Sequence, residues 1–315
     1  MGSKLLLGDA SKLHPGSGWH KAICDFMRRK AFMKKYSEAI MKIVFMLSGA
    51  VSILAVLMIC YFLFSEGLPT IGEIGVGNFL TGTVWKPLEN QFGIFPMIIG
   101  SIYVTAGAIV IGVPIGLLCA IFMAKFCPKG LYKIMKPAIE LLAGIPSIVY
   151  GFFGLMVIVP AMQQLTGTGG KGVLTASIML GIMILPTIIS VSESSIRAVP
   201  DSYYEGALAL GATHERSVFF TTVPAAKSGI MAGIILGIGR ALGETMAVVM
   251  VAGNQPVVPA ALTSGVRTLT SNIVIEMGYA AKGMHRDALI ATAVVLFVFI
   301  LIINISFSLV KKGDK

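Results

Sequence analysis

Six long apolar stretches constrain this chain more than any other feature of its sequence. They cover, roughly, residues 41–64, 95–123, 137–162, 172–191, 228–253 and 287–310. A helix of about 20 residues has the length that crosses a hydrocarbon core about 30 Å thick. Only 13% of the residues are charged, whereas a soluble domain has roughly 25%. We therefore predict an all-α integral membrane protein with six transmembrane helices.

The positions of the basic residues predict an orientation. Nineteen of the 25 Lys and Arg residues lie in the N-terminal segment through Lys42, after the second stretch, between the fourth and fifth, or after the sixth. Lys and Arg are retained on the cytoplasmic side of a membrane, so we expect both termini in the cytoplasm, beneath the inner membrane. The net charge of +10 is explained in this way. Because the sequence has no basic stripe interleaved with aromatic residues, we expect no nucleic-acid partner.

The chain divides into three parts on this interpretation. Residues 1–40 form a cytoplasmic N-terminal segment, residues 41–310 the membrane domain, and residues 311–315 a cytoplasmic tail. We expect no cleavable signal peptide, because the first apolar stretch is long enough to span. The four cysteines lack metal-ligand spacing and the four histidines lie far apart, so we expect no metal site. These residues are Cys24, Cys60, Cys119, Cys127, His14, His20, His214 and His285.

The segment 201–227, between the fourth and fifth stretches, is the most diagnostic part of the sequence. A short run of helix formers is broken at Gly211, and a second helical stretch through Phe220 ends at Pro224. Two helices joined by a glycine turn form a short rigid lever, although an ordinary amphipathic connector has the same pattern. The residues themselves resemble the EAA loop of permease subunits of ATP-binding-cassette importers. The matching positions are Glu205, Ala207, Gly211 and Pro224, while Gly206, Thr221 and Val223 depart from the motif.

This resemblance implies that the segment is a coupling helix, which inserts into a groove on a separate ATPase. It also implies that this subunit has no nucleotide site. The sequence agrees, because it contains no G-x-x-x-x-G-K-[ST] phosphate loop. We therefore expect a non-catalytic subunit that binds no cofactor, with ATP and Mg held by the partner ATPase.

The fifth stretch carries two opposite charges, Arg240 and Glu244. Arg240 lies about eleven residues from each end, near the bilayer midplane, where a charge costs at least about 2.5–3.5 kcal/mol. Glu244 follows at i+4, within ion-pairing reach on one helical face. Either the pair only specifies helix packing, or it faces a translocation pathway in which the guanidinium binds an oxyanion. We favour the pathway, since apolar residues often satisfy packing equally well or better.

Three glycines at a spacing of four precede these charges: Gly229, Gly233 and Gly237. Small residues at that spacing allow two helices to approach closely. On a regular helix Arg240 and Glu244 lie within about 60° of this row. We expect the row to form a tight helix contact, at an interface between subunits.

Three stretches carry a more specific resemblance, to the PstC-type family of phosphate permease subunits. They are R-A-L-G-E-T-M-A-V from Arg240, E-L-L-A-G-I-P-S-I-V-Y-G-F-F-G-L from Glu140 and F-L-T-G-T-V-W-K-P from Phe79. The resemblance runs from about Phe79 to Phe307. It implies a type I importer permease fold, with Arg240 and Glu244 in the phosphate pathway. It also implies a second, PstA-like permease, a PstB-like ATPase dimer and a PstS-like phosphate-binding protein as partners, besides membrane lipid.

Alternatives and weaker candidates stay open at this point. Permeases for sulfate and molybdate share a looser A-L-G-E, so another oxyanion, tungstate included, is possible. An ion-driven secondary transporter is the rival class, although the sequence has no clear inverted repeat. Ser147 and Tyr150 follow Pro146 and could line the pathway, or satisfy carbonyls that a kink leaves free. An interfacial anchor and a transport role explain Glu140 about equally well, whereas Trp85 is most simply an interfacial anchor and only secondarily a contact with a partner protein.

Overall fold

The computed structural model describes the backbone of residues 18–312, and the side chains of Glu38 and residues 40–306. Most of the predicted N-terminal segment and tail therefore lies outside the residues whose side chains are described. The chain divides into two compact units, the first ending at Phe62 and the second beginning at Leu63. The described part of the first unit belongs to one long helix, α1 (Gly18–Ile74), which continues into the second unit.

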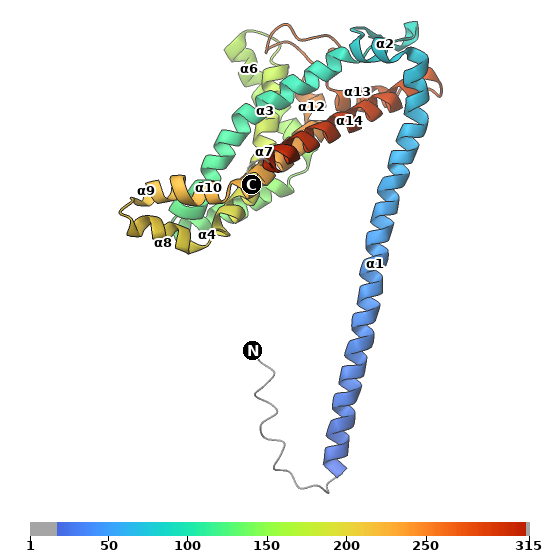
Figure 1. Ribbon diagram of the computed structural model, residues 1–315. Coiled ribbons are helices and arrows are strands. Elements are labelled where there is room, and N and C mark those ends of the chain that lie inside the picture. Colours follow the sequence, from blue (N-terminus) through green and yellow to red (C-terminus); the bar gives the residue numbers. More distant parts are fainter. Residues whose placement is uncertain (1–17, 313–315) are drawn as a thin grey trace. The chain divides into compact units, whose positions relative to one another are not determined.

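The second unit is almost entirely helical (Figure 1). After α1 come α2 (Val76–Thr81), a small antiparallel hairpin and the long helix α3 (Phe95–Ile121). In the hairpin, β1 (Trp85–Lys86) and β2 (Gln91–Phe92) flank the turn η2 (Pro87–Glu89), and Trp85 lies opposite Phe92. The helix α3 ends in a π-helical turn, η3 (Phe122–Phe126), and α4 (Lys129–Gly144) follows.

The second half of the chain contains the other spans. After α4 comes a helix interrupted by a π-turn, which consists of α5 (Ser147–Phe153), η4 (Gly154–Ile158) and α6 (Val159–Thr166). The helix α7 (Val173–Arg197) follows it. Next are α8 (Asp201–Ala209), α9 (His214–Ser217), η5 (Val218–Thr222), α10 (Val223–Ala225) and α11 (Lys227–Gly243). The last elements are α12 (Met246–Val251), α13 (Leu269–Met277) and α14 (Met284–Lys312).

The predicted all-α membrane fold is confirmed. Among the described residues, five helices are long and apolar enough to cross a membrane, and a bent pair raises the number to as many as six. The bent pair joins His214–Ala225 to Lys227–Gly243 at an angle of 70°. The five single helices are Ile40–Ile74, Phe95–Phe126, Ser147–Thr166, Val173–Arg197 and Met284–Ser306.

The predicted third span begins too early. We expected one helix over residues 137–162, but α4 ends at Gly144 and the spanning helix begins at Ser147. The cause is Pro146, because the residue before a proline is sterically biased away from the helical region. Ile145 accordingly has an extended ψ of 128°. As a result α4 is a separate amphipathic helix ahead of the span.

The helix α7 lies at the centre of the second unit and is the most buried of the spanning helices. It packs along α3 and α11, and its apolar side chains form a core with those of α5 and α12. Close approach to α3 depends on small residues. A Cβ atom added at Gly112 on α3, for example, would lie 2.8 Å from the side chain of Ile184.

Two further clusters mark the opposite ends of this unit (Figure 1). At one end the helices α4, α8, α9 and α10 lie together, over a cluster that includes Ile121, Ile196 and Val218. At the other end α2, the hairpin and α13 surround a cluster around Phe79 and Leu289. The fifth predicted stretch, with its two charges, runs between these ends.

Candidate functional site

Arg240 lies in the last turn of α11 and is half-buried. Its Nη1 atom donates to the hydroxyl of Thr187, on the neighbouring helix α7, over 3.4 Å. None of the ion pairs found among the described side chains includes Arg240. The guanidinium is therefore a cation whose hydrogen-bonding partner in this part of the chain is a neutral hydroxyl.

Glu244 does not pair with Arg240, so the predicted i+4 ion pair is wrong. The helix α11 ends at Gly243, and Glu244 has an extended backbone, with ψ of 133°. Its Oε1 atom accepts the backbone N–H groups of Thr245, over 3.1 Å, and Ala247, over 3.3 Å. Its carbonyl accepts the hydroxyl of Thr270, on α13, over 3.1 Å. The expected continuous helix over residues 228–253 is thus interrupted beside Arg240.

The interruption has a local cause in the sequence. Gly243 weakens the helix by its conformational freedom, and the Glu244 carboxylate offers the first N–H groups of α12 an acceptor that a continuous helix would not need. The ion pair was expected because residues four apart on an unbroken helix lie on one face. The helix ends at Gly243, so this spacing no longer brings Arg240 and Glu244 together.

Tyr150 lies near this site, on α5. It is buried, and its hydroxyl donates to the carbonyl of Leu142 over 2.8 Å, across the break at Ile145. It belongs to the same buried cluster as Ala241, the residue after Arg240. Tyr150 therefore makes the contact expected of the structural role, and a pathway role for it stays a prediction. A pathway role for Ser147 stays a prediction.

The glycine row of α11 faces α7 of the same chain. A Cβ atom at Gly237 would lie 2.9 Å from Ile188, and one at Gly233 would lie 3.1 Å from the hydroxyl of Ser192. A Cβ atom at Gly229 would overlap the hydroxyl of Ser195. The close contact that we expected between subunits is thus made within the chain, and it sets the separation of the two helices that carry Arg240 and Thr187.

The segment 201–227 forms two helices joined by a turn at Gly211, whose φ of +84° is in the left-handed region. Glu205 and Pro224 are exposed, and Ala207 is half-buried. The second helix continues beyond the expected end at Pro224 as far as Ala225. The π-turn η5 precedes this proline, and its wider hydrogen-bonding pattern accommodates a residue without an N–H.

Large apolar side chains are exposed on this lever, which we define as α8 to α10. Leu210 at the turn is 91% exposed, Phe220 is 76% exposed and Tyr203 is 53% exposed. Exposed apolar side chains grouped in this way mark surfaces that bind another protein or lipid. The turn itself is held by the hydroxyl of Tyr204 and Nδ1 of His214, which lie 2.7 Å apart.

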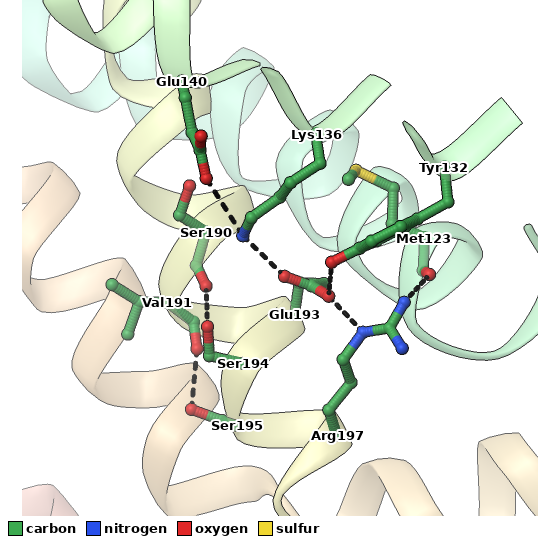
Figure 2. Close-up of polar contacts among 10 residues, drawn as sticks. All are labelled: Met123, Tyr132, Lys136, Glu140, Ser190, Val191, Glu193, Ser194, Ser195 and Arg197. Carbon is green, nitrogen blue, oxygen red and sulfur yellow. Dashed lines mark hydrogen bonds and ion pairs between the residues drawn. The ribbon is translucent and has the colours of Figure 1, made fainter. Parts of the chain in front are cut away.

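A buried carboxylate, Glu193, lies where α7 approaches the lever, and the sequence analysis missed it. Its side chain is only 2% exposed. It accepts hydrogen bonds from the hydroxyl of Tyr132, over 3.0 Å, and from Nζ of Lys136, over 2.9 Å, both on α4 (Figure 2). Arg197 also donates to it, one turn further along α7. The one signal in the sequence was the i,i+4 spacing of Glu193 and Arg197.

Two more contacts complete this cluster. Arg197 donates through Nη2 to the carbonyl of Met123 in η3, over 2.7 Å, and its guanidinium lies 4.4 Å from the ring centre of Tyr132. Glu140 approaches Lys136 to 3.9 Å (Figure 2). Burial lowers the pKa of Lys136, but its hydrogen bond and charge attraction to Glu193 outweigh this effect and raise the pKa above its usual value. Glu140 therefore has a charged partner, besides any contact with lipid headgroups.

The opposite end of the unit holds a second charged cluster. Arg267 donates to Glu276 over 2.8 Å and to the carbonyl of Asn254 over 2.9 Å. Trp85 is only 6% exposed and packs edge-on against Phe92 and His285, inside the unit. The expectation that Trp85 anchors the chain at the membrane surface is therefore wrong, because the hairpin turns its ring toward α14.

Comparison with known proteins agrees with this architecture. The family model described as "Binding-protein-dependent transport system inner membrane component" matches residues 112–313. A probable ABC transporter permease protein, YqgH of Bacillus subtilis, is 40% identical over 81% of this chain and 85% of its own length. The phosphate transport system permease protein PstC of Mesorhizobium japonicum is 36% identical over 72% of this chain and 75% of its own length.

A solved structure shows the same fold at low sequence identity. A chain of a bacterial alginate ABC transporter superimposes with a TM-score of 0.60 at 13% identity, covering 92% of this chain and 95% of that one. The predicted type I importer permease fold is confirmed by this likeness and by the family match. This chain belongs to the family of binding-protein-dependent transport system inner membrane components, and its resemblance to PstC-type permeases is confirmed by several PstC relatives.

Proposed function

We propose that this chain is a permease subunit of an ATP-driven importer and moves inorganic phosphate across the cytoplasmic membrane. The observation that carries the proposal is the state of Arg240. It is a half-buried cation beside a break in a spanning helix, and a neutral hydroxyl is its hydrogen-bonding partner in the described chain. The names of the PstC relatives support phosphate as the anion.

The charge at Arg240 favours an anionic substrate. A cation in a spanning segment is costly unless a counter-charge or water compensates it. Among the described residues Glu244 makes no ion pair with Arg240, and its Oε1 atom instead accepts the N–H groups of Thr245 and Ala247. A guanidinium presents several donors in a plane and binds oxyanions through two parallel hydrogen bonds. A passing phosphate would thus supply the counter-charge that the chain does not.

The lever supports the connection to an ATPase. Its exposed apolar residues, with Glu205 and Pro224 also exposed, form the surface that would contact the ATPase groove. On this proposal ATP and Mg bind to the ATPase dimer, this subunit is non-catalytic, and the lever transmits the closure of that dimer. The lever end and both termini then lie in the cytoplasm, with a second permease alongside and a phosphate-binding protein on the opposite face.

Reconstituted uptake tests this function. The chain is assembled with its second permease and ATPase in vesicles, together with the binding protein, and uptake of labelled phosphate is measured with sulfate or molybdate as competitor. We expect Arg240→Gln to abolish uptake while the complex assembles and hydrolyses ATP. Arg286→Gln is the matched control, because it removes an exposed arginine at the start of α14.

Three outcomes contradict the proposal. Unchanged uptake in the Arg240→Gln complex would remove Arg240 from the pathway. Competition by sulfate or molybdate at concentrations below that of phosphate would assign the permease to another oxyanion. Uptake without any ATPase, driven by an ion gradient, would place the chain in the rival class of secondary transporters.

A further inference from the structure

The Glu193 cluster lies at the base of the lever and joins the end of α7 to η3 and α4, whose contacting residues come 57 to 74 residues earlier in the sequence. Arg197 is the last residue of α7, and α8 begins four residues later, at Asp201. Through Glu193 the end of α7 is bound to α4, and through Arg197 it is bound to η3, at the end of α3 (Figure 2). Lys125 of η3 also pairs with Asp201 over 3.6 Å. The first turn of the lever is therefore paired with η3 and follows α7 directly in the chain, and α7 is in turn bound to η3 and α4.

The charges of this cluster are balanced as a set. Two carboxylates, Glu193 and Glu140, face two cations, Lys136 and Arg197. Glu193 accepts hydrogen bonds through both carboxylate oxygens, so its burial is compensated. Removal of one partner from such a buried set leaves an uncompensated charge and is strongly unfavourable. The set therefore holds α4 against α7 in one arrangement and resists small displacements.

From α4 the connection continues toward Arg240. The helix ends at Gly144, and Tyr150 of α5 donates across the break to the carbonyl of Leu142. Tyr150 in turn belongs to the same buried cluster as Ala241, the residue after Arg240. A displacement of α4 would accordingly reach α5 and the cluster that packs beside the end of α11. The helix α7 is a second connection, because it carries both Glu193 and Thr187, the hydrogen-bonding partner of Arg240.

We propose that Glu193 is a positioning residue for energy coupling: it makes α4 move with α7 and the lever, so that motion of the lever reaches the Arg240 site. This inference rests on the proposed transport function. Loss of the carboxylate should let the lever move while α4 stays behind. ATP would then be hydrolysed with little movement of substrate.

The experiment measures coupling in the complete complex, with binding protein, in vesicles. For each variant, three quantities are recorded: the amount of assembled complex, the rate of ATP hydrolysis, and phosphate uptake. For Glu193→Gln we expect the phosphate transported per ATP to fall about tenfold, within the range for residues that couple distant sites. Lys136→Gln should lower it similarly, and Lys136→Arg should restore it. Glu89→Gln, an exposed carboxylate at the opposite end, is the matched control.

A double variant shows whether the residues act as one unit. If they do, Glu193→Gln combined with Lys136→Gln lowers the ratio no further than either change alone. An unchanged ratio in assembled Glu193→Gln complex would overturn the inference. So would a fall of uptake and hydrolysis in proportion to the amount of complex, since that is the result of a folding role only.

A second measurement does not depend on the substrate. Spin labels are placed at Lys133→Cys on α4 and Ser202→Cys on α8, both exposed positions, in a chain whose native cysteines are replaced by serine. The distance between the labels should be the same with and without bound ATP, and Glu193→Gln should make it depend on ATP. A distance that already changes with ATP when Glu193 is present would overturn the inference. Failure of phosphate uptake in the unaltered complex would instead contradict the proposed function alone.

Discussion

Among the described residues Glu244 makes no ion pair with Arg240, and its Oε1 atom instead accepts the backbone N–H group of Ala247, three residues further along the chain, over 3.3 Å. Glu244 therefore stabilises the backbone at the start of α12, and on the proposed function the charge of Arg240 is left for the passing anion. This division of roles changes what substitutions at Glu244 should do. In an ion pair the negative charge matters, whereas in a helix cap only the acceptor oxygen matters.

We expect Glu244→Gln to retain most of the uptake, because its amide oxygen still accepts the N–H groups of Thr245 and Ala247. Glu244→Ala removes that acceptor and should destabilise the chain by about 0.5–2 kcal/mol, as for other lost helix caps. Uptake and thermal unfolding of the assembled complex are the measurements. Equal losses in both variants would restore the ion-pair interpretation.

The glycine row permits a matched comparison on one helix. Gly237 and Gly239 are both in α11, but a Cβ atom at Gly237 would lie 2.9 Å from Ile188, whereas one at Gly239 would meet nothing within 4 Å. Gly237→Ala should destabilise the chain by about 1–3 kcal/mol through overpacking. Gly239→Ala should leave stability unchanged or raise it by up to about 1 kcal/mol, through helix propensity. The same loss in both variants would show that the contact with α7 is not tight.

The lever offers a second matched pair. Gly211 has a φ of +84°, and Gly206 is in the middle of α8 with open space around it. Gly211→Ala forces a side chain into the left-handed region, at about 1–2 kcal/mol, and should weaken binding of the ATPase by altering the turn. Gly206→Ala should be neutral or stabilising. Co-purification of the ATPase with each variant checks the effect, and full binding by Gly211→Ala would contradict it.

The features that sequence predicted well are those that local chemistry decides. Apolar stretches identified the spans. Gly211 identified the turn of the lever, because the helix break there depends on the backbone conformation of the glycine itself. The break at Glu244 was missed because i+4 spacing also fits an unbroken helix, and the alternative is stabilised in part by Thr270 on another element. Glu193 was missed because its partners on α4 are 57 and 61 residues away in sequence.

The charge on Lys136 gives the Glu193 cluster a predictable dependence on pH. Contact with Glu193 raises the pKa of Lys136 above its usual value of 10.5, despite the opposing effect of burial. A cation whose pKa is raised by folding contributes its full stability below the unfolded pKa, and that contribution is lost as the pH rises through the folded pKa. The cluster should therefore be intact at neutral pH and weaken only in strongly alkaline solution.

Thermal unfolding of the purified complex measures this dependence. The pH is varied from neutral to about 11, a range that includes the usual pKa of a lysine. The unaltered chain should be more stable than Lys136→Gln at neutral pH, and the difference should shrink at the alkaline end. Lys136→Arg should keep the difference, because a guanidinium stays charged there. A difference between the unaltered chain and Lys136→Gln that stays constant across the range would show that packing of the Lys136 stem, and not its charge, holds α4 against α7.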